Sequence, residues 1–134
     1  MKYRFPYKLE ESSLLNKVYR PVIDFEVKTS NGWIPVLAYM DSGADVTLLP
    51  KSFIDLLDIR LDDHKISEIS GVGGEKVPVI LVKIGVRICK VFMQINAAIA
   101  LIEEVPYILG RDGVFDKFKV TFRQKIRAFY LESE

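Results

Sequence analysis

Residues 33–45 read WIPVLAYMDSGAD, an apolar run that ends abruptly at Asp41-Ser42-Gly43. The preceding segment, Val22–Lys28, alternates apolar with charged side chains, and a period of two is typical of a half-buried strand. Asn31-Gly32 lies between the two segments and favours a tight hairpin, because both residues tolerate positive φ. The residues from Trp33 to Met40 are more apolar throughout, which indicates a more central strand. The sequence therefore predicts a hairpin whose second strand places Asp41 at its end.

The rest of the chain predicts further strands, joined by short helices and glycine-rich turns. We expect short helices over 51–58 and 110–117, hairpins over 65–84 and 118–131, and apolar strands over 87–102. Pro78 lies in the second arm of the 65–84 hairpin. Because proline cannot donate to a strand ladder, this arm should be an edge or should project away from the barrel. We expect one all-β domain over residues 1–134, folded as a small closed barrel, in which the role of residues 1–20 is unassigned.

Composition excludes several classes of function. The chain has 134 residues, of which 49% are hydrophobic, enough for a continuous core without disulfides or metals. Its net charge is +1, and the basic residues between Lys117 and Arg127 mostly alternate with apolar ones. That alternation is typical of a strand with one solvated face, whereas a nucleic-acid-binding surface usually brings a strong net charge. We therefore expect no nucleic-acid partner.

The single cysteine and the single histidine limit the chemistry further. Cys89 cannot form an intrachain disulfide, which favours a reducing compartment, and its apolar neighbours indicate a small buried side chain in a strand. His64 without a cysteine cluster offers little for zinc, so we expect no metal and no cofactor. Residues 1–20 carry too many charges for a signal peptide, and the longest apolar stretch, 97–102, is too short to span a bilayer. We expect a cytoplasmic protein without a membrane partner.

Three motifs follow one another along the chain. They are Asp41-Ser42-Gly43-Ala44-Asp45 after an apolar strand, Ser70-Gly71-Val72-Gly73-Gly74 at a predicted hairpin tip, and Ile108-Leu109-Gly110-Arg111-Asp112 at the end of another apolar strand. Each motif alone is common, since Asp-Ser-Gly is usually an Asx-turn and a glycine-rich tip is usually a tight turn. Together, in this order on a β-rich chain of this length, they are specific.

The combination resembles the retropepsin-like aspartic proteases, the family of retroviral proteases and their cellular relatives. The resemblance runs from about Val22 to the C-terminus, and it implies a closed acid-protease barrel that acts as a homodimer. It implies catalytic residues at Asp41, Ser42 and Gly43, substrate-binding residues at Ala44, Asp45, Gly71, Val72, Gly73 and Gly74, and structural support of the site by Gly110 and Arg111. Viral members pair through their termini, whereas the closing hairpin from Phe118 is more similar to cellular members.

Amide hydrolysis by this route requires two carboxylates that face one water molecule. One carboxylate is ionised and takes a proton from the water, and the other is protonated and polarises the carbonyl. The chain contains one Asp-Ser-Gly motif, so the second carboxylate must come from a second copy across a two-fold axis. The function implied is an aspartic endopeptidase that cleaves extended peptides between two Asp41 carboxylates.

The neighbours of Asp41 have definable roles in this interpretation. The Ser42 hydroxyl could donate a hydrogen bond across the dimer axis. Asp45 is either an acceptor for the substrate backbone or the partner of Arg111 in a structural ion pair, and removing one partner of a largely buried pair costs about 3–5 kcal/mol. Asp112 is expected to cap a helix. Pocket specificity is expected to depend on apolar residues such as Val46, Ile69, Val72, Val77 and Ile80.

Two other interpretations belong to different classes. The chain could be a non-catalytic retropepsin-like module that dimerises and binds peptides or serves in assembly. It could also be a plain structural barrel in which Asp-Ser-Gly is a chance turn. The intact Asp41-Ser42-Gly43 favours the enzyme, because a binding module has no need of paired carboxylates.

Overall fold

A computed structural model describes residues 1–71 and 73–134, and strands dominate it. The strands are β1 (Lys2–Pro6), β2 (Lys8–Ser12), β3 (Asn16–Arg20), β4 (Val22–Thr29), β5 (Gly32–Met40), β6 (Thr47–Leu49), β7 (Ser67–Ser70), β8 (Lys76–Ile88), β9 (Val91–Ala100), β10 (Ile108–Leu109), β11 (Phe118–Arg123) and β12 (Ala128–Ser133). The helical elements of this part of the chain are α1 (Ser52–Leu56) and the short 3₁₀ turns Leu61–Asp63 and Gln124–Ile126.

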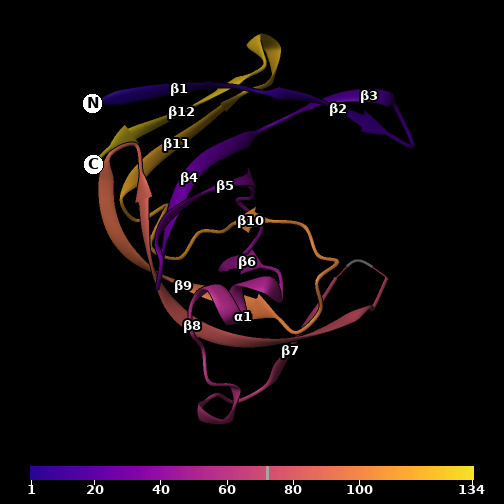
Figure 1. Ribbon diagram of the computed structural model, residues 1–134. Helices are drawn as coiled ribbons and strands as arrows, with labels where there is room; N and C mark the ends of the chain where they lie inside the picture. The colour runs from indigo at the N-terminus through magenta and orange to yellow at the C-terminus, as the bar shows by residue number, and fades with distance from the viewer. Residues whose placement is uncertain (72) are drawn as a thin grey trace.

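The central sheet closes into a barrel, as the sequence predicted. Its strand order is β4-β5-β10-β6-β9-β8-β7, and β4 also pairs with β8. The closing contacts join Glu26 to Arg87 and Val27 to Val86. Strand β7 lies outside this closure and pairs only with β8 in the described sheet (Figure 1). The all-β barrel is therefore confirmed, with one edge strand carried by the hairpin that precedes β9.

The β4–β5 hairpin forms as the alternation of its first strand predicts. Ile23, Phe25 and Val27 are buried on one face of β4, and the intervening charged residues point outward. The two-residue turn is made by Ser30 and Asn31, so the turn lies one residue earlier than predicted, and Gly32 already pairs as the first residue of β5. Hairpin pairing then continues to Tyr39, which fixes the direction in which the chain reaches Asp41.

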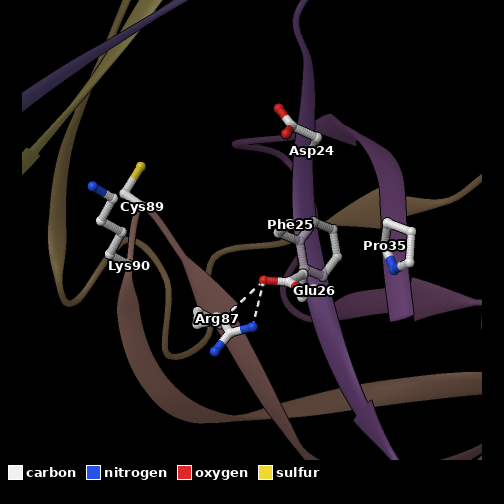
Figure 2. Close-up of a pocket in the computed structure, with 7 residues that line it drawn as sticks. All are labelled: Asp24, Phe25, Glu26, Pro35, Arg87, Cys89 and Lys90. Atoms are coloured by element: carbon white, nitrogen blue, oxygen red, sulfur yellow. Dashed lines mark hydrogen bonds and ion pairs between the residues drawn. The ribbon is translucent and has the colours of Figure 1, made fainter. Parts of the chain in front are cut away.

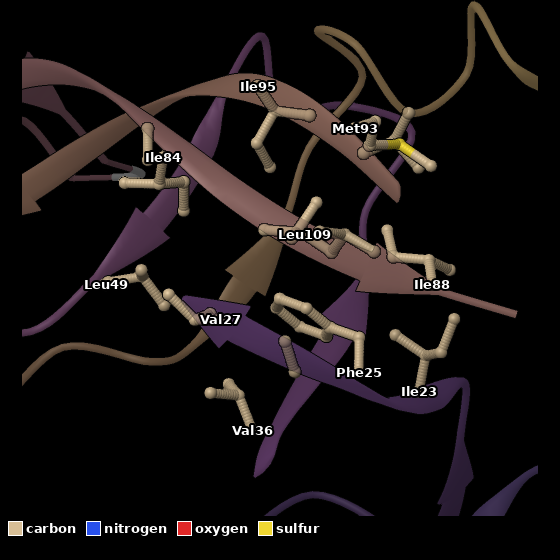
Figure 3. Close-up of a cluster of buried hydrophobic side chains, with 14 of the residues drawn as sticks. Ile23, Phe25, Val27, Val36, Leu49, Ile84, Ile88, Met93, Ile95 and Leu109 are labelled. Atoms are coloured by element: carbon tan, nitrogen blue, oxygen red, sulfur yellow. The ribbon is translucent and has the colours of Figure 1, made fainter. Parts of the chain in front are cut away.

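The core lies inside the barrel, between the β4–β5 hairpin and the β8–β9 hairpin (Figure 3). Leu49 from β6 and Leu109 from β10 fill its centre, and both are fully buried. Burying an aliphatic side chain of this size contributes about 1.5–3 kcal/mol. Because Leu109 immediately precedes Gly110, the packed core fixes the third motif against the first.

The β7–β8 hairpin extends beyond the barrel, which confirms the expectation drawn from Pro78. Strand β8 pairs with β9 only from Val79 onward. Residues 76–78 pair with β7 alone, so the proline lies in the part of the arm that leaves the barrel. The free end of this hairpin carries the glycine-rich motif (Figure 1).

The helix predicted over residues 110–117 is wrong. Residues 111–117 form consecutive turns, with hydrogen bonds from the Phe115 N–H to the Arg111 carbonyl (2.9 Å) and from the Phe118 N–H to the Val114 carbonyl (3.1 Å). Gly113 has φ +78°, a left-handed conformation that a right-handed helix cannot contain. The segment therefore turns tightly instead of extending along an axis. The helix over 51–58 does form, as the shorter α1.

Cys89 lies in a turn and not in a strand, which corrects the sequence interpretation. Cys89 and Lys90 join β8 to β9, and both have positive φ, 50° and 65°. The thiol is half-buried, and desolvation together with the nearby Asp24 carboxylate raises its pKa to about 11. At neutral pH the thiol therefore stays protonated, which disfavours any role as a nucleophile.

The N-terminal residues, unassigned by the sequence, form two separate pieces of sheet. Strand β1 pairs with β12, which lies between β1 and β11 in a three-stranded sheet. Strands β2 and β3 pair with each other as a two-stranded hairpin that lies beside the barrel (Figure 1). The closing hairpin over 118–131 is confirmed as β11 and β12. Across the described ranges, no helix has the length and apolar character needed to cross a membrane.

Candidate active site

Asp41 is held at the end of β5 by the backbone on both sides of it. The Asp41 N–H donates to the Leu109 carbonyl (3.1 Å), and the Met40 N–H donates to the Pro21 carbonyl (2.9 Å). The Asp41 carboxylate is half-buried, and its Oδ1 accepts a hydrogen bond from the Gly43 N–H at 2.8 Å. This local bond restricts rotation of the side chain, so the carboxylate has a defined orientation before any substrate is present.

The first and third motifs are joined by backbone hydrogen bonds. The Arg111 N–H donates to the Ala44 carbonyl (2.9 Å), and the Asp112 N–H donates to the Asp45 carbonyl (3.0 Å). A third bond links the Gly110 N–H to the Thr47 hydroxyl oxygen (3.1 Å). These two segments are far apart in sequence, and their interlocking makes a rigid base for Asp41.

Gly110 stands where the two segments approach most closely. A Cβ atom at this position would lie 2.3 Å from the Val46 carbonyl oxygen and 3.0 Å from the Ala44 carbonyl oxygen. Both neighbours are backbone atoms held in place by the bonds just described. The glycine is therefore required by the close approach, which supports the structural role that the resemblance implies.

Arg111 and Asp45 form an ion pair, but the pair is not largely buried. The Nη2–Oδ1 distance is 2.6 Å, and the two side chains are 47% and 88% exposed in the chain. Arg111 Nη1 also donates to the Ser42 carbonyl at 2.8 Å. The expected cost of 3–5 kcal/mol therefore does not apply to this chain, since an exposed pair contributes about 1 kcal/mol or less. Asp45 keeps enough free surface for contact with a substrate backbone as well.

Replacing Arg111 with alanine is expected to lower the free energy of unfolding by only about 1 kcal/mol. The same change removes the donor to the Ser42 carbonyl, so peptide cleavage should fall by much more than stability does. Urea unfolding and kcat/KM of the same preparation measure the two effects. Arg111→Lys is the matched control, because it keeps the charge but cannot reach both acceptors. A loss of 3–5 kcal/mol would instead support the buried-pair interpretation.

The glycine-rich motif forms the tip of the β7–β8 hairpin, hereafter the flap. The Gly71 N–H donates to the Glu75 carbonyl (3.0 Å), and the Gly74 N–H donates to the Gly71 carbonyl (3.2 Å). Gly73 and Gly74 have φ of +93° and +81°, a region that strongly favours glycine. Val72, also predicted to bind substrate, lies outside the described residues.

A pocket of about 270 Å³ lies between the Asp41–Asp45 motif and the flap. Its lining joins Gly43, Ala44 and Asp45 of the first motif to Ile69 and Ser70 of the flap, and it is completed by Val46, Leu48, Ala98 and Ile108. Of the apolar residues expected in a specificity pocket, Val46 and Ile69 line it. Ile80 is instead fully buried in the core, and Val77 packs against the small buried cluster that contains Leu48 and Ala98 without lining the pocket itself. A partly open, partly apolar pocket of this size is suited to one side chain of a bound chain.

Three pocket residues were missed by sequence reasoning. Leu48, Ala98 and Ile108 come from β6, β9 and β10, three strands that meet only through sheet pairing. Ile108 carried a usable signal, since it opens the third motif. No sequence signal identified Leu48 or Ala98, because whether these residues line a pocket depends on where the flap lies above the sheet.

Asp112 has a different role from the predicted helix cap. With no helix to cap, its carboxylate Oδ2 accepts hydrogen bonds from the Asn96 backbone N–H (3.2 Å) and from the Asn96 Nδ2 (3.0 Å). Asp112 therefore ties the turn after Gly110 to β9. These two hydrogen bonds engage the Asp112 carboxylate in holding the loop, which favours a structural role over a catalytic one.

A polar cluster on the other side of Asp41 was also missed. Tyr39 donates from its hydroxyl to Glu10 Oε1 (2.7 Å), and Arg20 donates from Nη1 to the same oxygen (3.0 Å). The bond to Glu10 and burial raise the pKa of Tyr39, and hydrogen bonds to Tyr39 and Glu10 raise the pKa of Arg20. The cluster attaches the β2–β3 hairpin to β5, two residues before Asp41. No local pattern announces it, because its members are brought together only by the fold.

Another cavity, of about 380 Å³, shares no residue with the three motifs. Figure 2 shows its lining, in which the Glu26 carboxylate pairs with Arg87 at 2.8 Å. Of its charged residues, Glu26 and Arg87 pair with each other, and the Cys89 thiol in its lining is protonated at neutral pH, because its pKa is raised to about 11. Within residues 1–71 and 73–134, no group of three or more His, Cys, Asp or Glu side chains is placed to share a metal ion.

Solved structures of proteases have a similar fold. A retropepsin-like aspartic protease from Rickettsia conorii aligns over 98% of this chain and 90% of its own, with a TM-score of 0.66 and 17% sequence identity. The EIAV protease complexed with the inhibitor HBY-793 aligns over 76% of this chain and 88% of its own, with a TM-score of 0.51 and 22% identity. No protein-family model matches the sequence, and no curated protein sequence matches it. The chain therefore has the fold of the retropepsin-like aspartic proteases.

Proposed function

We propose that the protein is an aspartic endopeptidase that is active as a homodimer and cleaves extended peptides. The observation that carries the proposal is the placement of Asp41. Its carboxylate is oriented by the Gly43 N–H on a rigid base, beside a pocket that the flap borders. A carboxylate fixed close to a pocket that takes one side chain of a bound peptide is the arrangement that water activation at a peptide bond requires.

The chemistry needs two Asp41 carboxylates, one from each subunit, on either side of one water molecule. Like charges about 3 Å apart do not both ionise readily, so the pair shares one proton and titrates as a unit. The ionised carboxylate takes a proton from the water as it attacks the peptide carbonyl. The protonated carboxylate donates a hydrogen bond to the carbonyl oxygen and then gives up its proton as charge develops there.

The substrate is expected to lie as an extended chain between the catalytic loop and the flap. Exposed backbone groups at the flap end can pair with such a chain, which adds main-chain affinity independent of sequence. The pocket lined by Val46, Leu48 and Ile69 takes one side chain, and its apolar character favours an aliphatic residue over a charged one. Closing of the flap over the peptide excludes water from the site.

No cofactor takes part in this mechanism. The single cysteine is compatible with work in the reducing cytoplasm.

Cleavage rate per subunit should rise with protein concentration and level off as the dimer saturates, because a monomer holds half a site. Adding Asp41→Asn subunits to wild type tests the shared site directly. At about tenfold excess of the variant, random pairing leaves about one tenth of wild-type subunits with a wild-type partner, so specific activity should fall about tenfold.

The measurement is a dilution series of initial rates on a peptide library, with sedimentation velocity at the same concentrations. The matched control is the same excess of a double variant in which Asp41→Asn is combined with a change that prevents pairing, which should not inhibit. Constant specific activity at every dilution, from a species that sediments as a monomer, would rule out the homodimer mechanism.

A further inference from the structure

The β2–β3 hairpin is an exposed apolar element with no sheet partner in the described chain. It belongs to a two-stranded sheet of its own, and its leucines are turned outward. Leu9, Leu14 and Leu15 are 51%, 92% and 67% exposed. A two-stranded hairpin is marginally stable alone in water, and neighbouring exposed leucines, here Leu14 and Leu15 in its turn, indicate an interaction surface. These residues, hereafter the hairpin leucines, therefore need a partner.

The hairpin is nevertheless held in a fixed position next to the catalytic strand. Glu10 from β2 and Arg20 from β3 both bond in the cluster with Tyr39, and the Arg20 guanidinium lies over the Tyr39 ring at 5.9 Å. Because Tyr39 is two residues before Asp41, the position of the hairpin is tied to the position of the carboxylate. A mobile tail would not be anchored through a partly buried ion pair and a phenol.

A groove continues from the base of the hairpin to Asp41. A cavity of about 290 Å³ is lined by Arg20, Tyr39 and Asp41, with Pro106 on its other side. A second cavity of about 320 Å³ shares Tyr39 and Pro106 with the first and reaches the exposed Leu37. If two Asp41 carboxylates are to meet, the partner must occupy the space beside Asp41. The groove therefore makes the hairpin surface continuous with the place where a second copy has to sit.

The terminal strands are already paired within one chain. Strand β12 is flanked by β1 on one side and β11 on the other, and the Ser133 N–H donates to the Met1 carbonyl (3.0 Å). Pairing of β12 with a second copy, as in viral members that pair through their termini, would require this three-stranded sheet to separate, because β12 has no free edge. The hairpin and the flap, in contrast, both project toward the right of Figure 1, the side on which the barrel carries the groove-lining loop before β10.

We propose that the hairpin leucines form the surface that binds the second copy of this chain. The inference rests on the proposed function, since the need for a second carboxylate identifies the occupant. In a two-fold dimer each subunit contributes its own hairpin, so the two hairpins make two equivalent apolar contacts. The hairpin thus serves as the dimerisation element, and the Glu10–Tyr39–Arg20 cluster sets its distance from the catalytic carboxylate.

The test compares two pairs of exposed leucines in the Asp41→Asn background, where oligomeric state is measured without self-cleavage. Leu14→Ser with Leu15→Ser should raise the dimer dissociation constant at least about tenfold. This factor corresponds to a loss of about 1.4 kcal/mol of binding free energy from the apolar contact. Leu61→Ser with Leu81→Ser is the matched control, because Leu61 and Leu81 are 41% and 57% exposed elsewhere on the surface. The control should change the constant less than twofold. Sedimentation velocity over a concentration series provides both values.

Each outcome separates this inference from the proposed function. An unchanged dissociation constant in the hairpin variant overturns the inference, even where wild type cleaves peptides in a concentration-dependent way. A weakened dimer in a protein that never cleaves peptides supports the inference and refutes the protease. A wild-type monomer at all concentrations overturns both. Normal dimerisation with lost peptide binding would assign the surface to substrate and overturn the inference. Thermal unfolding checks that the variants fold, and Leu14→Ala replaces the double change if they do not.

Discussion

Replacing Asp41 with asparagine is expected to abolish peptide cleavage, lowering kcat by about 10⁴-fold or more. An amide can neither accept the proton of the attacking water nor donate an acidic proton to the carbonyl oxygen, so both catalytic roles are lost in the dimer. The fold should persist, because the side-chain amide oxygen of the Asp41→Asn variant can accept the same hydrogen bond from the Gly43 N–H that Oδ1 accepts at 2.8 Å. The Asp41→Asn variant is therefore expected to lose catalysis while it keeps the fold.

The measurement is cleavage of a peptide library from acidic to neutral pH, with circular dichroism and sedimentation on the same sample. Asp55→Asn is the matched control, since Asp55 is an exposed carboxylate on α1 and should leave turnover unchanged. Wild-type turnover in the Asp41 variant would show that the carboxylate does not act. Peptide binding without cleavage in the wild type would favour the non-catalytic module instead.

Replacing Gly110 with alanine should lower the free energy of unfolding by about 3 kcal/mol or more. The added methyl group would lie 2.3 Å from the Val46 carbonyl oxygen and 2.4 Å from its carbonyl carbon. These are backbone atoms within an interlocked pair of loops, so no side-chain rotation relieves the contact, and the cost should reach or exceed the upper end of the about 1–3 kcal/mol typical of overpacking. The displaced Val46 also lines the pocket, so residual folded protein should cleave poorly.

Gly71→Ala is the matched control for this change. A Cβ at Gly71 meets no atom within 4 Å, and its φ lies outside the left-handed region, so stability should change by less than about 0.5 kcal/mol. Equilibrium unfolding in urea gives both values. Equal stability of the two variants would mean that the loops separate easily, and that the base of Asp41 is not rigid.

Local patterns were sufficient to predict the barrel and the order of its motifs. The alternation in Val22–Lys28 identified the buried face of β4, because a half-buried strand has a period that shows in the sequence. The Asp-Ser-Gly motif marked the end of β5 for a similar reason, since turn-forming residues follow an apolar run there. The pairing of Arg111 with Asp45 was predicted from the resemblance, and the structure contains it.

Features that depend on distant contacts could not be predicted in this way. The exposure of Asp45 follows from which atoms cover it in the fold, and sequence spacing carries no such information. Turns form after Gly110, where a helix was predicted, because Gly113 takes a left-handed conformation. Glycine can adopt this conformation but does not always do so, so the sequence alone could not predict it. Within residues 1–20, β1 was unassigned because its partner β12 is distant in sequence, and the attachment of the β2–β3 hairpin could not be predicted because it depends on Tyr39 of β5.

The pairing of β1 with β12 also governs when the protein can finish folding during its synthesis. Lys2 pairs with Glu132, so β1 waits for its partner strand β12, which is synthesised about 130 residues later. At about 5–20 residues per second, that delay lasts roughly 7–26 seconds, during which Tyr3 and Phe5 have no strand to pair with. The barrel strands β4–β10 lie between and can close first. A nascent chain should therefore form the β1–β12–β11 sheet only after β12 has been synthesised, and a ribosome stalled before that point should leave β1 open to proteases and chaperones.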